Sequence, residues 1–338
     1  MPRKGGWSRA GSHRHFRYLD VRGRRITDPA KLARIEALAI PPAWKEVWIS
    51  PRPTAKLQAT GIDAAGRRQY LYHENYRTAQ EEAKFDKLVR FADALPAFRE
   101  AMSDHMELES LAPEWTCAIA VRLINLGWFR VGDERYTKAH KTFGITTLRK
   151  GHVSVRGSRI AFRFRSKHRA WVRTAVVDSE LAEAMRELLL IRGGQRLFRY
   201  RLDEELYNLT ARRLNEYIAE HMGADFTAKD FRTWGGTLLA AIGLAERGPA
   251  ETEAEAKRKL AAVMRVVGEQ LGNTPAVARS SYVSPAVVEQ YLDGRTINDF
   301  RPRHLRIVGA RETGLNLEEQ ALVSLLRSWR IRQARKAA

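Results

Sequence analysis

The chain has 338 residues, 44% of them hydrophobic, and its 59 Lys and Arg against 39 Asp and Glu give a formal net charge of +20. This composition excludes wholesale disorder and, at this length, suggests two domains with real cores. No apolar run approaches the ~20 residues of a membrane-spanning helix, and the single cysteine, Cys117, excludes an internal disulfide. We therefore expect a protein of the cytoplasm or nucleoid with a polyanionic partner, such as DNA, RNA or an acidic membrane surface.

Residues 1–75 are rich in β-forming residues and turn signals. Segments 16–21 and 45–50 are typical of strands, and the sequences around Gly23 and Gly66 are typical of turns. A short helix over 29–38 is expected between these strands. We predict that residues 1–80 form a small, mostly β domain.

After residue 76, apolar residues recur at helical spacing, beginning with Phe85, Leu88 and Val89. Segment 152–177 interrupts the helical pattern, because its residues alternate and turn candidates occur at 156–158 and 166–168; it predicts a small antiparallel sheet of three strands. Helices are then expected to the end of the chain, the last over 317–335. We predict an α+β protein in which residues 81–338 form a larger, mainly helical domain containing that sheet.

Motifs that bind nucleotides or metals are missing from the sequence. There is no G-x-x-x-x-G-K-[ST] loop for ATP phosphates and no paired-cysteine zinc pattern. An enzyme acting on nucleic acid would then need no cofactor, metal or nucleotide, and would transfer a phosphoryl group to a side chain beside cationic residues. Such a site requires a nucleophile, cations on the phosphate oxygens and an acid for the leaving hydroxyl. Composition cannot choose among the many Arg and Tyr residues.

Five ordered segments carry the most specific information in the sequence. They are Gly66-Arg-Arg-Gln-Tyr-Leu-Tyr72, Phe129-Arg-Val-Gly-Asp-Glu-Arg-Tyr136, Phe164-Arg-Ser-Lys-His168, Lys229-Asp-Phe-Arg-Thr-Trp-Gly235 and Leu271-Gly-Asn-Thr-Pro-Ala-Val-Ala-Arg-Ser-Ser-Tyr282. Together they resemble the motifs of type IB DNA topoisomerases of the poxvirus and bacterial kind. The resemblance spans roughly residues 16–292. It implies relaxation of positive and negative supercoils through a 3′-phosphotyrosyl intermediate, without ATP or metal.

The resemblance also implies the catalytic roles. Tyr282 is the implied nucleophile, and Arg130 and Arg232 are implied to brace the non-bridging phosphate oxygens. Lys167, at a turn of the predicted sheet, is the implied general acid for the leaving 5′ oxygen. Many relatives have histidine at the position of Asn273, and asparagine can donate a hydrogen bond to a phosphate oxygen but cannot carry a charge there.

The implied partner is duplex DNA, clamped by a monomer, with no membrane and no nucleotide involved. Contacts to DNA are implied at Arg67, Arg68, Gln69, Tyr70, Tyr72 and Tyr136. Arg67 and Gln69 suit base edges in the major groove. On the presumed strand we expect Tyr70 to face opposite to Gln69 and Tyr72.

Three further residues are interpreted as structural. Trp171 and Trp234 are expected in the core, and Asp230 is expected to be a helix N-terminal charge or part of an ion pair.

Two alternatives remain at this point. A tyrosine site-specific recombinase shares the Arg, Lys, Arg and Tyr chemistry, but usually has a helical N-terminal domain and a histidine next to or near the second arginine. This chain instead has a β-rich N-terminal part and has Asn273 within the segment L-G-N-T-P. A non-catalytic, basic DNA-binding protein fits the net charge of +20, but gives no reason for the ordered motifs. We therefore favour the topoisomerase.

Overall fold

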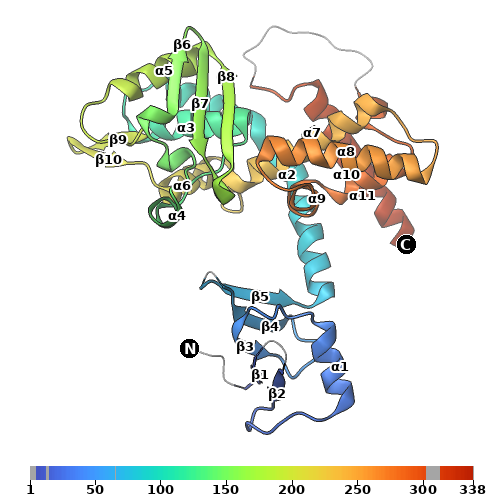
Figure 1. The fold of residues 1–338 in the computed structure, drawn as a ribbon. Coiled ribbons are helices and arrows are strands. Elements are labelled where there is room, and N and C mark those ends of the chain that lie inside the picture. The colour runs from blue at the N-terminus through green and yellow to red at the C-terminus, as the bar shows by residue number, and fades with distance from the viewer. Residues whose placement is uncertain (1–4, 13–14, 65, 302–312, 338) are drawn as a thin grey trace. The chain divides into compact units, whose positions relative to one another are not determined.

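The computed structural model describes residues 5–12, 15–64, 66–301 and 313–337, and the chain divides into two compact units, Met1–Lys84 and Phe85–Ala338. The predicted α+β class is confirmed, with a β-rich N-terminal part and a mainly helical remainder (Figure 1). In the part of the chain that is described, no helix is both long and apolar enough to cross a membrane.

The first unit is built on a five-stranded antiparallel sheet in the order β2-β1-β3-β4-β5. Its elements are β1 (Trp7–Ala10), β2 (Arg17–Leu19), α1 (Pro29–Ala37), β3 (Lys45–Ile49), β4 (Leu57–Ile62) and β5 (Arg68–Tyr72). The expected helix is confirmed as α1, which begins after Asp28; this side chain accepts hydrogen bonds from the backbone N–H groups of Ala30 and Lys31. Ile35 of α1 packs with strand residues such as Ile49 and Ala59 in a separate small core.

The predicted orientation of Tyr72 on β5 was wrong, although Tyr70 does face opposite to Gln69 as expected. Arg68, Tyr70 and Tyr72 are exposed, whereas Gln69 and Leu71 are half-buried. Side chains two residues apart on a strand share a face, so Tyr72 lies with Tyr70 and opposite to Gln69. The rings of Tyr70 and Tyr72 stack with their centroids 6.2 Å apart.

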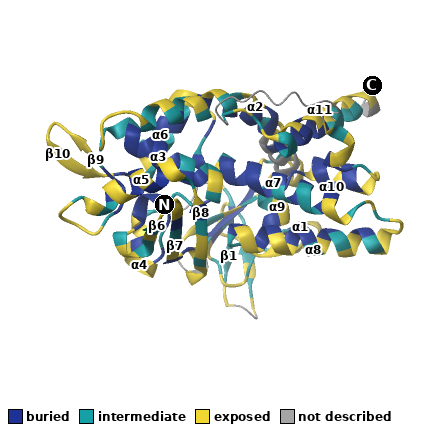
Figure 2. Ribbon diagram, turned by 90° about the horizontal axis from the view of Figure 1, so that it is seen from above, coloured by how far each residue is buried: buried dark blue, intermediate teal, exposed yellow. Residues whose placement is uncertain are grey.

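The second unit is mainly helical. Helix α2 (Glu74–Met106) spans the boundary between the units in sequence, and the later helices are α3 (Pro113–Gly127), α4 (Glu134–His140), α5 (Ser179–Leu190), α6 (Ala211–Met222), α7 (Ala228–Arg247), α8 (Glu253–Leu271), α9 (Pro275–Tyr282), α10 (Pro285–Leu292) and α11 (Leu317–Ala337). Helices α3 and α7 are buried along most of their length (Figure 2). They therefore form the centre of the core of this unit.

The predicted three-stranded antiparallel sheet is confirmed as β6 (Val153–Arg156), β7 (Arg159–Arg165) and β8 (Trp171–Val177). Its inner face buries alternate residues of β7, namely Ile160, Phe162 and Phe164. Trp171 was expected in the core, but it is 48% exposed. The reason is its register: Trp171 lies opposite Arg165 on the outer face of the sheet.

A second hairpin was not predicted. Strands β9 (Arg199–Leu202) and β10 (Glu205–Asn208) pair in antiparallel fashion within a segment that was expected to be helical. Asp203 and Glu204 form the two-residue turn, and both have positive φ, 47° and 65°. The usual sequence for such a turn is Asn-Gly or Asp-Gly, so the dipeptide Asp-Glu did not predict it.

A buried ion pair attaches α11 to the core. Glu319 is 3% exposed and accepts hydrogen bonds from Arg99 of α2 at 2.7 and 2.9 Å and from the indole N–H of Trp234 at 3.2 Å. Burial alone would raise the pKa of the Glu319 carboxyl, but hydrogen bonding and charge from Arg99 outweigh it, so the pKa lies below its ordinary value of 4.5. Trp234 itself is 2% exposed, as expected for a core residue.

This pair predicts a pH-dependent loss of stability. Since the folded-state pKa of Glu319 is lowered, its contribution is complete above about pH 4.5 and disappears as the pH falls through the folded value. Glu319→Gln leaves the charge of Arg99 unmatched and should cost about 3 kcal/mol at pH 7. Urea denaturation should show that the difference in unfolding free energy between Glu319→Gln and the parent shrinks on acidification, because the Glu319 carboxyl of the parent then becomes uncharged as well. A deficit independent of pH would contradict this account.

Candidate functional site

The candidate site lies where three segments of the second unit meet: the chain after α3, the first turns of α7, and the junction of α8 with α9. Hydrogen bonds join these segments directly, although the first lies more than one hundred residues from the other two in sequence. The sequence-predicted residues Arg130, Arg232 and Asn273 belong to these segments, and Tyr282 lies at the other end of α9.

Arg130 follows a tight end to α3. Trp128 closes that helix in the left-handed conformation, with φ 50°. The Arg130 guanidinium then donates to the Gly272 carbonyl at 2.7 Å, to Asn273 Oδ1 at 2.8 Å and to Ser166 Oγ at 3.2 Å. Burial and the neighbouring charge of Arg232 lower the pKa of Arg130 to about 10.

Arg232 lies in the second turn of α7 and is 5% exposed. Its guanidinium donates to the Trp128 carbonyl and to the Leu271 carbonyl, the latter at 2.8 Å. Among the described residues neither Arg232 nor Arg130 forms an ion pair with a carboxylate. One buried and one half-buried positive charge are therefore held near each other by neutral oxygens, an arrangement that favours binding of an anion.

The start of α7 is fixed by its own capping interactions. Asp230 accepts a hydrogen bond from the Thr227 N–H at 2.8 Å and forms an ion pair with Lys87 at 2.9 Å. This confirms the interpretation of Asp230 as a structural charge at a helix N-terminus.

Tyr282 is the last residue of α9, and its side chain is half-buried. The centre of the Arg232 guanidinium lies 5.1 Å from the centroid of the Tyr282 ring. Burial alone would raise the pKa of the phenol, but charge and hydrogen bonding from Arg232, together with the charges of Arg130 and Lys229, lower it overall. The phenol of Tyr282 thus has two guanidinium neighbours, of which that of Arg232 is buried and that of Arg130 is half-buried.

Asn273 is the first residue beyond the αL cap of α8. Gly272 has φ 60°, and the Asn273 N–H donates to the Gly268 carbonyl at 2.7 Å, which closes the helix end. The Asn273 side chain accepts from Arg130 and donates to the Leu271 carbonyl at 3.3 Å. The same helix end therefore orients Asn273 and supplies carbonyls to both arginines.

Lys167 lies in the short 3₁₀ turn Lys167–Arg169 between β7 and β8, and it is exposed. Of the described side chains, none forms an ion pair with it. The preceding residue, Ser166, receives the hydrogen bond from Arg130. Ser166 thus ties the lysine turn to the two arginines, a role that the sequence gave no reason to expect beyond its place next to Lys167.

Two glycines of α7 provide the space for this arrangement. A Cβ atom at Gly235 would lie 2.2 Å from Nε1 of Trp128, and one at Gly236 would lie 2.9 Å from both Cβ and the carbonyl oxygen of Tyr282. The Tyr282 carbonyl also accepts a hydrogen bond from Thr237 at 3.1 Å. Side-chain volume at position 236 would displace the end of α9.

Tyr136, another predicted contact residue, lies on α4 and is 44% exposed, with its ring 5.9 Å from that of His140.

In the first unit, Asp63 contacts two of the predicted DNA-binding residues. It forms an ion pair with Arg67 at 2.8 Å and accepts a hydrogen bond from Gln69 at 2.8 Å. Arg68 lies 3.9 Å from Glu46.

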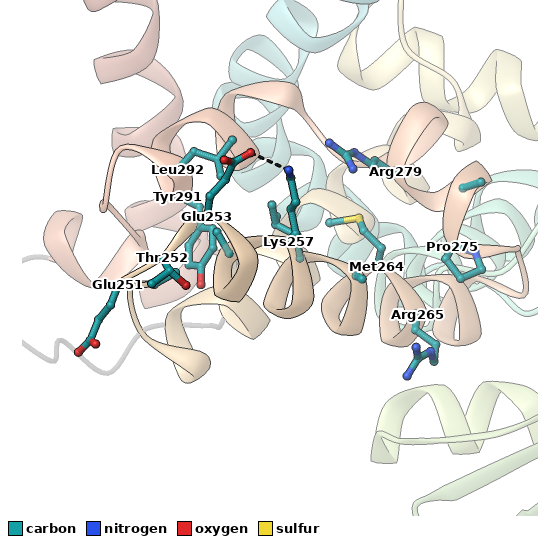
Figure 3. Close-up of a pocket in the computed structure, with 15 residues that line it drawn as sticks. Glu251, Thr252, Glu253, Lys257, Met264, Arg265, Pro275, Arg279, Tyr291 and Leu292 are labelled. Atoms are coloured by element: carbon teal, nitrogen blue, oxygen red, sulfur yellow. Dashed lines mark ion pairs between the residues drawn. The ribbon is translucent and has the colours of Figure 1, made fainter.

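A groove of about 930 Å³ is bordered by α8, α9 and α10 (Figure 3). Its lining includes Met264, Pro275 and Arg279, and an ion pair joins Lys257 to Glu253 at 2.6 Å. None of the predicted catalytic residues lines it, so the groove is distinct from the candidate site. Within the described residues, no three His, Cys, Asp or Glu side chains are grouped so that they could hold a metal ion.

Comparison with known proteins identifies the family. Residues 73–300 match the family model of the eukaryotic DNA topoisomerase I catalytic core, and residues 15–63 match that of the bacterial DNA topoisomerase IB N-terminal domain. DNA topoisomerase 1B of Acanthamoeba polyphaga mimivirus is 31% identical over 268 residues, which cover 77% of this chain and 80% of the viral protein. DNA topoisomerase 1B of Vaccinia virus (strain Copenhagen) is 22% identical over 243 residues, which cover 70% and 73%.

These matches define the chain as a DNA topoisomerase. It belongs to the type IB family, which confirms the resemblance of the five ordered segments.

The packing of α9 against α7 predicts opposite effects for two glycine substitutions. Gly236→Ala should destabilise the protein by about 1–3 kcal/mol, because the new methyl group overpacks against Tyr282. Gly243→Ala, on the same helix, meets Val263 only at an ordinary 3.4 Å, and should be neutral or stabilising by about 0.5–1 kcal/mol. Urea denaturation of both variants tests this, and equal stabilities would contradict the close packing at position 236.

Proposed function

We propose that this protein relaxes positive and negative supercoils in duplex DNA by cutting one strand through a transient 3′-phosphotyrosyl bond at Tyr282. The proposal includes independence of nucleotides, metals and other cofactors. The observation that carries it is the position of a phenol beside one buried and one half-buried arginine that have no carboxylate partner among the described residues. A DNA phosphodiester would supply the missing negative charge.

In the proposed cleavage step, the Tyr282 oxygen attacks the scissile phosphorus as the phenol proton is lost. The bond from phosphorus to the 5′ oxygen breaks, and that oxygen leaves as a hydroxyl after receiving a proton. Religation is the reverse attack by the 5′-hydroxyl. Because the phosphotyrosyl bond replaces one phosphodiester by another, no external energy source is needed. The lowered pKa of the Tyr282 phenol supports its role, since the proton is removed more easily at neutral pH.

Arg130 and Arg232 would stabilise the charge that accumulates on the non-bridging oxygens. Guanidinium groups suit this task because they remain charged and can bind two oxygens in a fixed plane. Their hydrogen bonds to backbone carbonyls hold them in place before DNA arrives, so little reorganisation is required during the reaction.

Lys167 is proposed as the acid that protonates the leaving 5′ oxygen. Its exposed place on the β7–β8 turn leaves the ammonium able to reach DNA, and the bond from Arg130 to Ser166 keeps that turn at the site. Asn273 is proposed to donate a hydrogen bond to a phosphate oxygen. One N–H of its amide is bonded to the Leu271 carbonyl, and the second N–H would be the donor to the phosphate.

The β-rich residues 1–80 are proposed to bind DNA as the second part of a monomeric clamp, in the cytoplasm and at the nucleoid. Asp63 holds Arg67 and Gln69 together, which favours their use on neighbouring base edges. The exposed pair Tyr70 and Tyr72 offers stacked rings close to Arg68. Tyr136 is proposed as a further contact.

Plasmid relaxation tests the function. Supercoiled plasmid is incubated in EDTA without nucleotide, with the parent protein and with Tyr282→Phe, and the topoisomers are resolved on agarose. The parent should give a ladder of relaxed topoisomers and Tyr282→Phe none, although it still binds DNA. Tyr291→Phe is a matched control, since Tyr291 is 2% exposed. A plasmid that stays supercoiled with the parent protein across a salt titration, or equal relaxation by the parent and Tyr282→Phe, would contradict the proposal. Site-specific recombination or DNA binding without catalysis would then be favoured.

A further inference from the structure

The outer face of the β6–β7–β8 sheet is a second concentration of positive charge. Its exposed arginines and its exposed tryptophan, defined by strand register and here called the arginine face, are Arg156, Arg159, Arg163, Arg165, Trp171 and Arg173. No carboxylate lies among the residues of that face, and none of its arginines forms an ion pair with any described residue. By contrast, Arg122 and Arg213 elsewhere in this unit each pair with two carboxylates.

The register places like charges directly opposite each other. Arg163 of β7 faces Arg173 of β8 across the sheet. Like charges in such positions destabilise a sheet. A protein that needed only a solvated face could place an acidic residue or threonine at either position. The repeated arginines therefore indicate that a polyanion neutralises this face.

Trp171 holds the arginines together. The guanidinium groups of Arg165, Arg163 and Arg173 lie 5.1, 5.4 and 5.7 Å from the centroid of its ring. Each contact offsets part of the repulsion between the charges and limits side-chain motion. This explains why an indole is 48% exposed at the edge of the sheet.

The face offers several cations to one strand of DNA. Arg163 and Arg165 are two residues apart on one strand of the sheet, which corresponds to about 6.8 Å along β7. The face is also continuous with the proposed catalytic turn, because the pair Arg165 and Trp171 immediately flanks residues 166–170.

We propose that the arginine face binds the phosphate backbone of the duplex arm that carries the 5′-hydroxyl after cleavage, and slows its rotation. This rests on the proposed function, in which Lys167 contacts the leaving 5′ oxygen while Tyr282 retains the 3′ side. A sheet attached to the lysine turn then lies beside the arm that leaves. Since this arm turns about the uncut strand, every phosphate contact made to it must be broken as it swivels.

Salt-dependent binding tests the surface without requiring cleavage. In a Tyr282→Phe background, the pair Arg163→Gln and Arg173→Gln is compared with the pair Arg258→Gln and Arg265→Gln, two exposed arginines of α8. Affinity for a linear duplex is measured against salt concentration. Two lost phosphate contacts should reduce the steepness of the log–log plot by about 1.8, while the α8 pair should keep the parent slope. Thermal unfolding should show the first pair to be at least as stable as the parent, because it removes a like-charge pair.

Rotation is measured with Tyr282 intact, on single tethered DNA molecules. The pair Arg163→Gln and Arg173→Gln should remove at least about twofold more supercoils per cleavage and religation cycle than the parent. An unchanged salt slope, or the same loss of slope for the α8 pair, would overturn the proposed surface. A reduced slope with unchanged steps would overturn its assignment to the rotating arm. A parent protein that removes no supercoils would instead contradict the proposed function, while the binding result would still report on the arginine face.

Discussion

The site depends on two neighbouring guanidinium groups, that of Arg232 buried and that of Arg130 half-buried, without a carboxylate partner among the described residues. Burial of a charge is costly unless the charge is compensated, and backbone carbonyls compensate only part of it. The carbonyls of Trp128, Leu271 and Gly272 fix the directions of Arg130 and Arg232 while leaving their net charge available. This uncompensated positive charge therefore favours binding of an anion next to the Tyr282 phenol.

The local backbone conformation sets the positions of these carbonyls. Trp128 and Gly272 both end helices in the left-handed conformation, with φ 50° and 60°, and in each case the chain reverses so that a carbonyl faces an arginine. Glycine adopts this conformation without strain, whereas Trp128 does so at a cost, which its packing against Gly235 helps to offset. The arginine face differs from the site, because its charges are exposed and strand register places them around one indole ring.

The sequence was sufficient where a physical period or a strong motif was present. Alternation predicted the three-stranded sheet, the short helix over 29–38 was predicted and is found as α1, and ordered motifs identified the family. It failed where tertiary context decides: Trp171 is apolar but lies on the outer face, and the β9–β10 hairpin turns through Asp203 and Glu204 with positive φ. Ser166 and Gly236 could not be recognised, because their importance comes from distant residues that approach them only in the fold.

The most direct test of the central claim is to identify the residue to which DNA becomes attached. Protein and plasmid are mixed, denatured rapidly and digested with nuclease and trypsin, and the nucleotide-bearing peptides are sequenced by mass spectrometry. The tryptic peptide Ser280–Arg295 contains both Tyr282 and Tyr291, so fragment ions must distinguish them. The account predicts a 3′-phosphate linkage on Tyr282 alone, with a free 5′-hydroxyl on the other fragment. Attachment to Tyr291 or another residue, a 5′-phosphate linkage, or relaxation without any attached nucleotide would contradict it.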